Sequence, residues 1–282
     1  MASRGFIRVL TYLCQMQKEI SSPQNPLVKQ LLQLIEKSRE RRKQGLFVIE
    51  GQREILLALR GGYELTTFLF CTEIATETEL SALKKELDPT TQLIEITSEV
   101  YQKLAYRSTT EGVLAIAKAK ELSLDSLPLK NKNSLILVAE APEKPGNIGA
   151  LLRTADAANL DAVIIANPRT DLYNPNSIRS SVGCLFTNSL ATGTTSEIIA
   201  FLKEKGIPIY CAALQASKIY TDIDYRENSA IVVGTEADGL SREWLDHSSE
   251  NILIPMQGSI DSMNVSVAAG ILVFEAKRQR GY

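Results

Sequence analysis

The sequence predicts an α/β protein with two domains, and three observations lead to this prediction. Short apolar runs typical of strands alternate with longer segments of helical apolar spacing along most of the chain. The length of 282 residues is enough for two domains that each bury their own core. Residues 122–133 have no clear apolar period. We therefore expect a smaller domain over 21–120, a linker over 121–133 and a second domain over 134–282.

The first domain is expected to begin with a helix from Pro26 to about Lys43, with Leu27, Leu31 and Leu34 on its apolar face. The far end of this helix, SRERRKQ, is strongly basic. The remaining expected elements are strands at 46–49, 65–71, 92–96 and 113–117 and helices at 52–60, 77–87 and 98–106.

The second domain is expected to be a parallel sheet with helices on its faces, joined by right-handed crossovers. Asn147 and Asn264 are plausible N-caps for its first and last helices. The expected strands are 135–139, 162–166, 208–212, 230–233 and 252–254, and the expected helices are 148–159, 176–181, 197–205, 241–246 and 265–280.

The last of these helices is apolar nearly all round in its first three turns. Such a helix is usually covered on more than one side, so we expect its own sheet on one side and a partner chain on another. The sequence thus predicts a homodimer through this helix, with Leu272 and Val273 in the interface.

Composition limits the possible classes of protein. Hydrophobic residues make up 44% and charged residues 23%, which is typical of a soluble globular protein. Four scattered cysteines without a CxxC pair indicate reduced thiols and a cytoplasmic location. A single histidine, His247, and no Cys/His cluster argue against a metal site.

The charge is unevenly distributed along the chain. Residues 1–62 hold 11 basic and 5 acidic residues, whereas the remainder holds 20 and 28. A basic run of this kind can hold a phosphate backbone, although on charge alone a solvated charged helix is the usual interpretation. The residues concerned are Arg39, Arg41, Arg42 and Lys43. Residues 1–20 are expected to be an extension or a start placed too far upstream, with Met16 as the true beginning; an organellar presequence is the other reading.

Three segments of the second domain contain the candidate site: 147–156 (NIGALLRTAD), 232–241 (VVGTEADGLS) and 251–280, which begins NILIPMQGSIDSMNVSVAAG. Gly234 ends an apolar run, and a glycine there lets the backbone approach a ligand. In the third segment a strand ends at Pro255 and a polar loop of small residues leads into the last helix. This pattern predicts a ligand site at the carboxyl end of the sheet.

These three segments, in this order, resemble the motifs of the SpoU (TrmH) family of RNA ribose 2′-O-methyltransferases, a branch of the knotted SPOUT class. The first 118 residues also resemble the substrate-binding domain of that family, in SPQNPLVKQLLQL and TTEGVLAIAK. The resemblance implies a trefoil knot in the second domain, S-adenosylmethionine as the methyl donor, no metal, and transfer to structured RNA. We expect ribosomal RNA as the substrate. A tRNA enzyme and a non-catalytic RNA-binding member are the alternatives.

The resemblance also implies roles for individual residues. The catalytic positions are Asn147, Arg153, Glu236, Ser262 and Asn264. The cofactor contacts are Leu214, Gly234, Ile254, Met256 and Met263. Two further residues, Arg179 and Ser181, are expected to reach RNA.

Arg153 is the residue on which the expected mechanism depends. At ~100° per residue it points away from the apolar face of its helix, where a solvated arginine would be the ordinary interpretation. The family resemblance implicates it in deprotonating or positioning the ribose hydroxyl. A guanidinium stays protonated and is a poor base, so we expect Arg153 to bind the target phosphate and stabilise the developing alkoxide.

Overall fold

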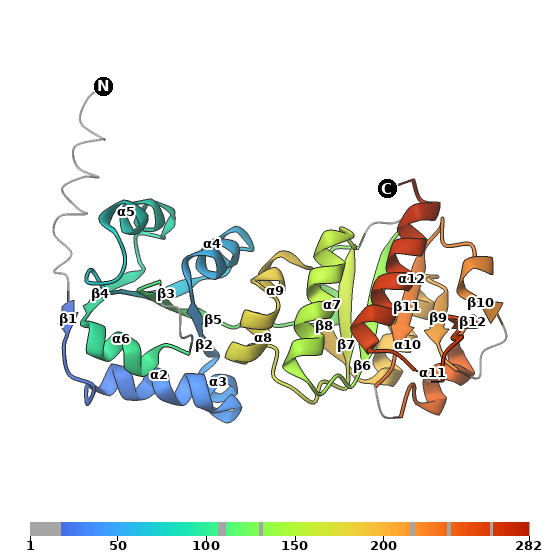
Figure 1. The fold of residues 1–282 in the computed structure, drawn as a ribbon, viewed down its shortest axis with the longest axis horizontal. Helices are drawn as coiled ribbons and strands as arrows, with labels where there is room; N and C mark the ends of the chain where they lie inside the picture. Colours follow the sequence, from blue (N-terminus) through green and yellow to red (C-terminus); the bar gives the residue numbers. More distant parts are fainter. Residues whose placement is uncertain are drawn as a thin grey trace, which may run out of the picture. The chain divides into compact units, whose positions relative to one another are not determined.

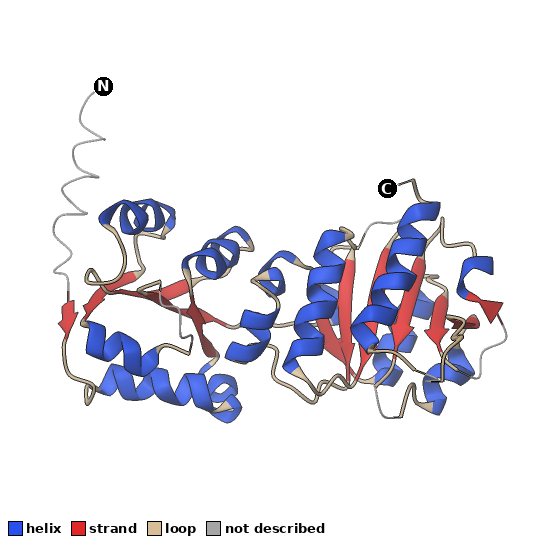
Figure 2. Ribbon diagram, viewed as in Figure 1, coloured by secondary structure: helices blue, strands red, loops and turns tan. Residues whose placement is uncertain are grey.

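The computed structural model describes residues 18–106, 111–129, 132–214, 218–235, 238–259 and 262–281. The chain divides into two compact units, and the division falls between Ala119 and Lys120. In each unit a sheet lies between layers of helices (Figures 1 and 2). No helix among these residues is long and apolar enough to cross a membrane.

The first unit contains a five-stranded mixed sheet in the order β1-β4-β3-β5-β2. β1, β4 and β3 are parallel neighbours, and β5 pairs antiparallel with both β3 and β2. Helices α2 and α6 pack on one face, with α4 and α5 on the other (Figure 1). The strands are β1 (Lys18–Ile20), β2 (Leu46–Glu50), β3 (Leu65–Phe70), β4 (Gln92–Ile96) and β5 (Val113–Lys118), and the helices are α2 (Pro26–Glu36), α3 (Ser38–Gln44), α4 (Gln52–Arg60), α5 (Glu77–Glu86) and α6 (Ser98–Leu104).

The prediction of a single helix over 26–43 is wrong, because the chain leaves the helical conformation at Lys37 (φ −117°, ψ 111°). The Arg41 guanidinium folds back from α3 and donates to the backbone oxygens of Leu34 at 2.6 Å and Ile35 at 3.0 Å. These carbonyls belong to the last turn of α2, where no intrahelical donor is available. Arg41 is only 4% exposed. The prediction that Arg41 holds an RNA phosphate is therefore wrong, since its charge is used inside the fold.

The first unit also starts earlier than expected. Residues Lys18–Ile20 pair with β4, so they belong to the sheet and not to an extension. Residues 1–17, with the expected alternative start at Met16, lie outside the described part of the chain.

The second unit is a seven-stranded sheet in the order β10-β12-β9-β11-β6-β7-β8, in which every pairing is parallel. The chain runs from β6 through β7 to β8 at one edge, and then returns to β9 on the far side of β11. This confirms the predicted fold class. The strands are β6 (Leu135–Glu140), β7 (Ala162–Ala166), β8 (Leu190–Gly193), β9 (Ile209–Ala212), β10 (Lys218–Ile219), β11 (Ser229–Val233) and β12 (Glu250–Leu253).

Helices cover both faces of this sheet (Figure 2). One face packs against α10 and α11 through a core that includes Ile198, Leu202 and Trp244. On the other face α12 packs against α7 and β11. The helices are α7 (Pro145–Ala157), α8 (Pro175–Ser180), α9 (Cys184–Thr187), α10 (Thr195–Glu204), α11 (Arg242–His247) and α12 (Val265–Gln279), with short 3-10 turns at η1 (Leu124–Ser126) and η2 (Tyr220–Asp222). The trefoil knot, expected from the resemblance alone, stays a prediction.

The segment expected to be a linker packs on the second unit. Leu124, Leu127 and Leu129 contact the core beneath α10. The backbone of Thr192 in β8 donates to the carbonyl of Leu122 at 2.7 Å. The second unit therefore includes this segment. Its first helix also begins earlier than expected, with Lys144 at the N-cap, so the prediction that Asn147 caps α7 is wrong.

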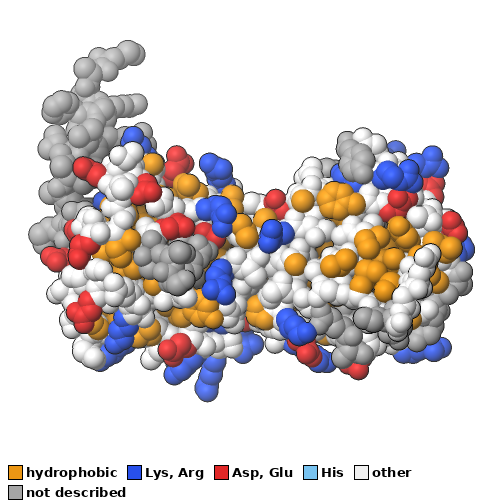
Figure 3. All heavy atoms as spheres, viewed as in Figure 1, with side chains coloured by type: hydrophobic (Ala, Val, Ile, Leu, Met, Phe, Trp, Pro, Cys, Tyr) orange, Lys and Arg blue, Asp and Glu red, His pale blue; other side chains and the backbone are white. Residues whose placement is uncertain are grey.

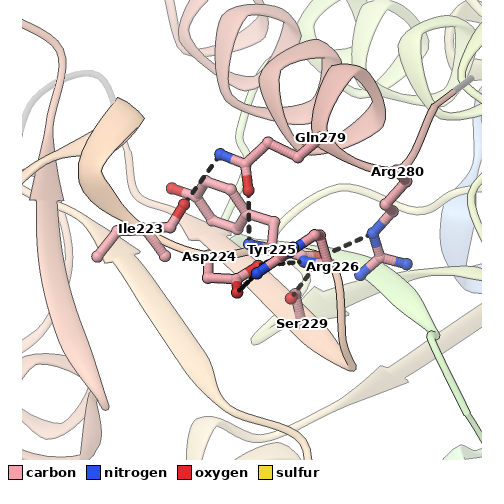
Figure 4. A network of polar contacts seen from close by, with 7 residues as sticks. All are labelled: Ile223, Asp224, Tyr225, Arg226, Ser229, Gln279 and Arg280. Carbon is pink, nitrogen blue, oxygen red and sulfur yellow. Dashed lines mark hydrogen bonds and ion pairs between the residues drawn. The ribbon is translucent and has the colours of Figure 1, made fainter.

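The last turn of α12 is fixed to the loop that precedes β11 (Figure 4). The Gln279 amide donates to the Ile223 carbonyl at 2.9 Å and accepts from the Tyr225 N–H at 2.9 Å. The Arg280 guanidinium donates to the carbonyls of Tyr225 at 2.7 Å and Ser134 at 3.4 Å. Its further acceptors are the carbonyls of Asn133 and Glu227. Burial lowers the pKa of Arg280. The end of α12 is thus bound to the segments that lead into β6 and β11.

Candidate functional site

The predicted cofactor contacts come together at one edge of the second sheet. β9 lies between β12 and β11, and all three strands are parallel. Their carboxyl ends therefore meet, and the residues that follow them include Leu214, Ile254 and Gly234. Met256 and Met263 belong to the loop between β12 and α12. Five positions from three distant segments of the sequence are brought to the same edge.

Apolar side chains are exposed at this edge beside backbone groups. Leu214 is 62% exposed and Met256 is 38% exposed, whereas Ile254 and Met263 are half-buried. Exposed apolar side chains beside loop backbone fit a ligand with an apolar ring and polar ends. Burial raises the pKa of the nearby Cys211 thiol in β9 to about 12, so this thiol is not a nucleophile at neutral pH. Within the described ranges, no group of three His, Cys, Asp or Glu side chains could hold a metal ion.

The loop after β11 is a tight turn that folds back on Gly234. Thr235 N–H donates to the Gly239 carbonyl at 2.9 Å, and Gly239 N–H donates to the Thr235 carbonyl at 3.2 Å. A Cβ atom at position 234 would lie 2.2 Å from the Gly239 carbonyl carbon. The turn itself therefore requires glycine at 234, in addition to the ligand approach expected from the sequence. Glu236 lies outside the described residues.

A cavity of about 310 Å³ opens beside this turn, between the carboxyl ends of β6 and β11. Because the strand order reverses next to β6, this is the place where parallel α/β sheets usually bind ligands. The cavity is lined by Ala139, Glu140, Ala141, Pro142, Glu143, Lys144, Asn147, Leu151, Gly234, Thr235, Asp238 and Val265.

A hydrogen bond joins the first and third sequence segments at this cavity. Asn264 Nδ2 donates to Asn147 Oδ1 at 3.2 Å, although the two residues are 117 positions apart in the chain. Asn264 Oδ1 also accepts from the Ser266 N–H at 2.9 Å, which confirms Asn264 as the N-cap of α12. Ser262 is exposed in the loop just before it. The two asparagines thus fix the starts of α7 and α12 to one another.

Arg153 is exposed on α7 and is not among the residues that line the cavity. It follows Gly149 by four residues, so the two lie on the same side of the helix. A Cβ atom at Gly149 would lie 2.2 Å from Ser180 Oγ, which shows how closely α8 approaches that side. Arg153 and the exposed Arg179 of α8 are therefore placed on neighbouring helices that touch.

The prediction that Ser181 reaches RNA is wrong. Ser181 is fully buried, and its hydroxyl donates to the Ile178 carbonyl at 2.8 Å and accepts from the Leu185 N–H at 3.3 Å. These bonds hold the turn between α8 and α9. The same turn contains Val182 at φ 57°, a conformation that a β-branched residue rarely adopts. The position is structural, and the neighbouring Arg179 is the exposed group.

The other three basic residues, Arg39, Arg42 and Lys43, are exposed on α3 in the first unit. Lys and Arg side chains gather there on the surface (Figure 3). They stay candidates for phosphate contacts.

A buried carboxylate that lines the cavity, Glu140, was not identified from the sequence. Glu140 closes the apolar strand Leu135–Glu140 and is 6% exposed. A carboxylate at the end of a strand whose residues are all buried is the signal that would have indicated it.

Comparison with known proteins agrees with this geometry. Residues 134–274 match the model of the SpoU rRNA Methylase family, and residues 25–115 match an MRM3-like substrate binding domain. A relative from Bacillus subtilis (strain 168), 23S rRNA (guanosine(2553)-2′-O)-methyltransferase RlmP, is 30% identical over 92% of this chain and 99% of its own length.

Two solved structures are also similar over nearly the whole chain. A crystal structure of an RNA 2′-O ribose methyltransferase has 38% identity and a TM-score of 0.80, covering 94% of this chain and 100% of that one. The SpoU methyltransferase AviRb from Streptomyces viridochromogenes, in complex with AdoMet, has 26% identity and a TM-score of 0.84, covering 91% and 98%. On these matches the chain belongs to the SpoU rRNA methylase family.

Proposed function

We propose that this protein transfers a methyl group from S-adenosylmethionine to a ribose 2′-hydroxyl of ribosomal RNA. The observation on which the proposal rests most directly is the contact between Asn147 and Asn264 at the cavity beside Gly234. It joins two of the three family motifs at the edge where a ligand site is expected. The relative RlmP, named for the same chemistry on 23S rRNA, matches nearly all of the chain.

Methyl transfer to a hydroxyl requires alignment of the acceptor oxygen and loss of its proton. S-adenosylmethionine supplies the activated methyl group. Asn147 and Asn264 shape the wall of the cavity, and Glu236 orients an arginine or the target nucleotide. Arg153 binds the target phosphate and stabilises the alkoxide as it forms, while the proton leaves to a phosphate oxygen or to water.

The donor is held by the loops that follow β9, β11 and β12. Leu214 and Met256 offer exposed apolar surface to the adenine ring, and Gly234, Ile254 and Met263 offer backbone groups. Side-chain charges are scarce among these five positions, so binding depends on loop geometry. No step of this chemistry requires a metal ion.

The protein acts as a homodimer through α12 in this proposal. Val267 is 54% exposed and Phe274 is 40% exposed on this helix, and hydrophobic side chains gather over it on the surface (Figure 3). Covering such a patch favours association. Leu272 and Val273 were expected in the interface, but both are fully buried in the core of their own unit, so that expectation is wrong.

The association is tested with Val267→Asp and Phe274→Asp, because these substitutions place charge on the exposed side of α12. Small-angle scattering is expected to show a dimer for the unaltered protein and a monomer for the double variant. A fully active monomer at micromolar concentration would contradict the proposal.

The activity is tested by mapping 2′-O-methylated nucleotides in the RNA of cells that lack this protein. Loss of one ribosomal RNA methylation, restored by the purified protein with S-adenosylmethionine, is the expected result. Loss of a tRNA methylation would identify the tRNA alternative. Failure to bind S-adenosylmethionine in a calorimetric titration would indicate a non-catalytic RNA-binding member.

A further inference from the structure

Glu140 is a buried carboxylate at the carboxyl end of β6, and it lines the cavity described above. It is 6% exposed. Taking a carboxylate out of water is costly unless its oxygens are hydrogen-bonded. The hydrogen bonds that the Glu140 oxygens accept therefore indicate the role of this residue.

The two oxygens of Glu140 accept from two different elements. Oε2 accepts from the backbone N–H of Ser241 at 2.8 Å, and Oε1 accepts from Thr195 Oγ1 at 3.2 Å. Thr195 Oγ1 in turn accepts from Asn167 Nδ2 at 2.9 Å. In the part of the chain that the structure describes, no ion pair reaches Glu140. The carboxylate is satisfied by neutral donors and works as a pair of acceptors.

The bond from Ser241 fixes the turn that follows β11. Ser241 is the N-cap of α11 and comes two residues after Gly239, which pairs with Thr235 to close the turn. Its partner Glu140 is 101 positions away in the chain. Gly234, Thr235 and Asp238 of this segment line the same cavity as Glu140. The Glu140–Ser241 bond therefore determines where the turn stands against the end of β6.

We propose that Glu140 is a positioning residue for methyl transfer, which acts through Ser241 on the cavity-lining residues Thr235 and Asp238. The inference rests on the proposed function, because it takes the cavity lined by Gly234, Thr235 and Asp238 as part of the place of reaction. Glu140 acts by the placement of its oxygens and not by its charge. A shift of the turn by about 1 Å is enough to lower the rate by about 10²-fold when a reacting group is misplaced.

Two substitutions separate geometry from charge. Glu140→Gln keeps the side-chain length and an oxygen for the Ser241 N–H, but it removes the charge. Glu140→Asp keeps the charge, but it is one methylene shorter and cannot reach Ser241 without movement. We expect Gln to retain kcat within about threefold and Asp to lose about 10²-fold in kcat, with KM for RNA unchanged in both. A normal rate in the Asp variant, or a rate in the Gln variant as low as that expected for Asp, would overturn the proposal.

Two further variants test which of the two hydrogen bonds of Glu140 affects kcat. Thr195→Val breaks the other bond to Glu140 while leaving the Ser241 contact in place, and it should keep kcat even if stability falls. Ser241→Pro removes the N–H donor from the turn side, and the φ of −63° at this position suits proline. It should reproduce the loss in kcat that is expected of Glu140→Asp. Equal losses in kcat for Thr195→Val and Ser241→Pro would overturn the inference.

Amide hydrogen exchange tests the turn without any need for activity. Protection of the Ser241 amide should persist in Glu140→Gln and Thr195→Val and be lost in Glu140→Asp. If the unaltered protein did not methylate RNA, the proposed function would be wrong. The exchange data would still show whether Glu140 holds the turn. Equal protection in all three variants would remove the inference alone.

Discussion

Arg153 and Arg41 both lie on helices, but their surroundings indicate different roles. Arg153 is exposed on α7, beside the elements that frame the cavity. Arg41 is buried, and its guanidinium completes the last turn of α2. A guanidinium cannot give up its proton, so a buried arginine must donate its hydrogen bonds within the fold, whereas an exposed one can donate to water or to an anion. Exposure decides between these roles, and charge patterns in a sequence do not reveal it.

Arg153→Ala is expected to lower the methylation rate by ~10²–10³, the scale seen when one preorganised donor is removed. The side chain is outside the core, so folding and S-adenosylmethionine binding should be unchanged. Arg153→Lys should recover little, because an ammonium cannot reproduce a bidentate fork. Single-turnover assays measure the rate, and circular dichroism serves as the folding control. A normal rate in the alanine variant would remove Arg153 from the mechanism.

Substitutions in α3 should separate a structural arginine from RNA contacts. Neutralising the exposed Arg39, Arg42 and Lys43 should flatten the salt dependence of RNA binding by up to ~0.7–0.9 in log–log slope for each phosphate that is no longer bound. Arg41→Ala should leave that slope unchanged but lower the free energy of unfolding by about 1.5–3 kcal/mol, because two carbonyls lose a charged donor. Filter binding at several salt concentrations and urea denaturation measure the two effects. An unaltered slope in the triple variant would favour a solvated helix.

At the scale of whole elements, α12 is held at both ends. Its first turn is joined to α7 through Asn264 and Asn147, and its last turn to the segments before β6 and β11 through Gln279 and Arg280 (Figure 4). Gln279 and Arg280, at the end of the third motif, therefore hold the fold together through backbone contacts. The contact at the start of the helix also fixes the backbone next to Met263.

Arg280→Ala is expected to lower the free energy of unfolding by about 3 kcal/mol, since carbonyls in the two segments that precede β6 and β11 lose a charged donor. Arg278→Ala is the matched control. Arg278 pairs with Glu275 at 2.8 Å with 62% of the arginine side chain exposed, and Gln279 also donates to this carboxylate, so the loss should be below about 1 kcal/mol. Urea denaturation monitored by the fluorescence of the buried Trp244 measures both values. Equal losses would contradict the role of Arg280.

Most elements could be predicted because the spacing of apolar residues within each segment indicates its secondary structure, as in the strand Ala162–Ala166 and the helix Gln52–Arg60. The errors occur where a distant residue decides the local conformation. The break at Lys37 is stabilised by Arg41, which reaches back to α2. The segment from Leu124 to Leu129 has no period of its own because its leucines pack individually on α10 and its surroundings.

The site was predictable only as far as its motifs are continuous in sequence. Asn147, Gly234 and Asn264 could be named because each belongs to a recognisable segment. Glu140 could not, because its significance depends on the Ser241 N–H, and only the sheet brings the two together. The prediction that Ser181 reaches RNA was wrong because a sequence motif does not show whether a residue is buried.

At the scale of the whole molecule, each unit has its own core, and every described residue that lines the cavity belongs to the second unit. A fragment of residues 120–282 should therefore fold cooperatively and bind S-adenosylmethionine in the presence of EDTA, but it should lose the salt-dependent affinity for RNA that the basic residues of α3 provide. The shorter fragment 134–282 lacks Leu124, Leu127 and Leu129 and exposes the core that they cover.

Removal of these three partly buried leucines should make the shorter fragment less stable by several kcal/mol, because each leucine stabilises by up to about 1.5–3 kcal/mol when fully buried. Urea denaturation of the two fragments measures this difference, and calorimetric titration measures donor binding in each. Equal stability would show that residues 120–133 are a linker, as the sequence suggested, and that their packing contributes nothing. Binding that requires a divalent ion would contradict a site made of loop backbone and apolar side chains. Cooperative unfolding and donor binding by the longer fragment alone would place the boundary of the methyltransferase unit at Lys120.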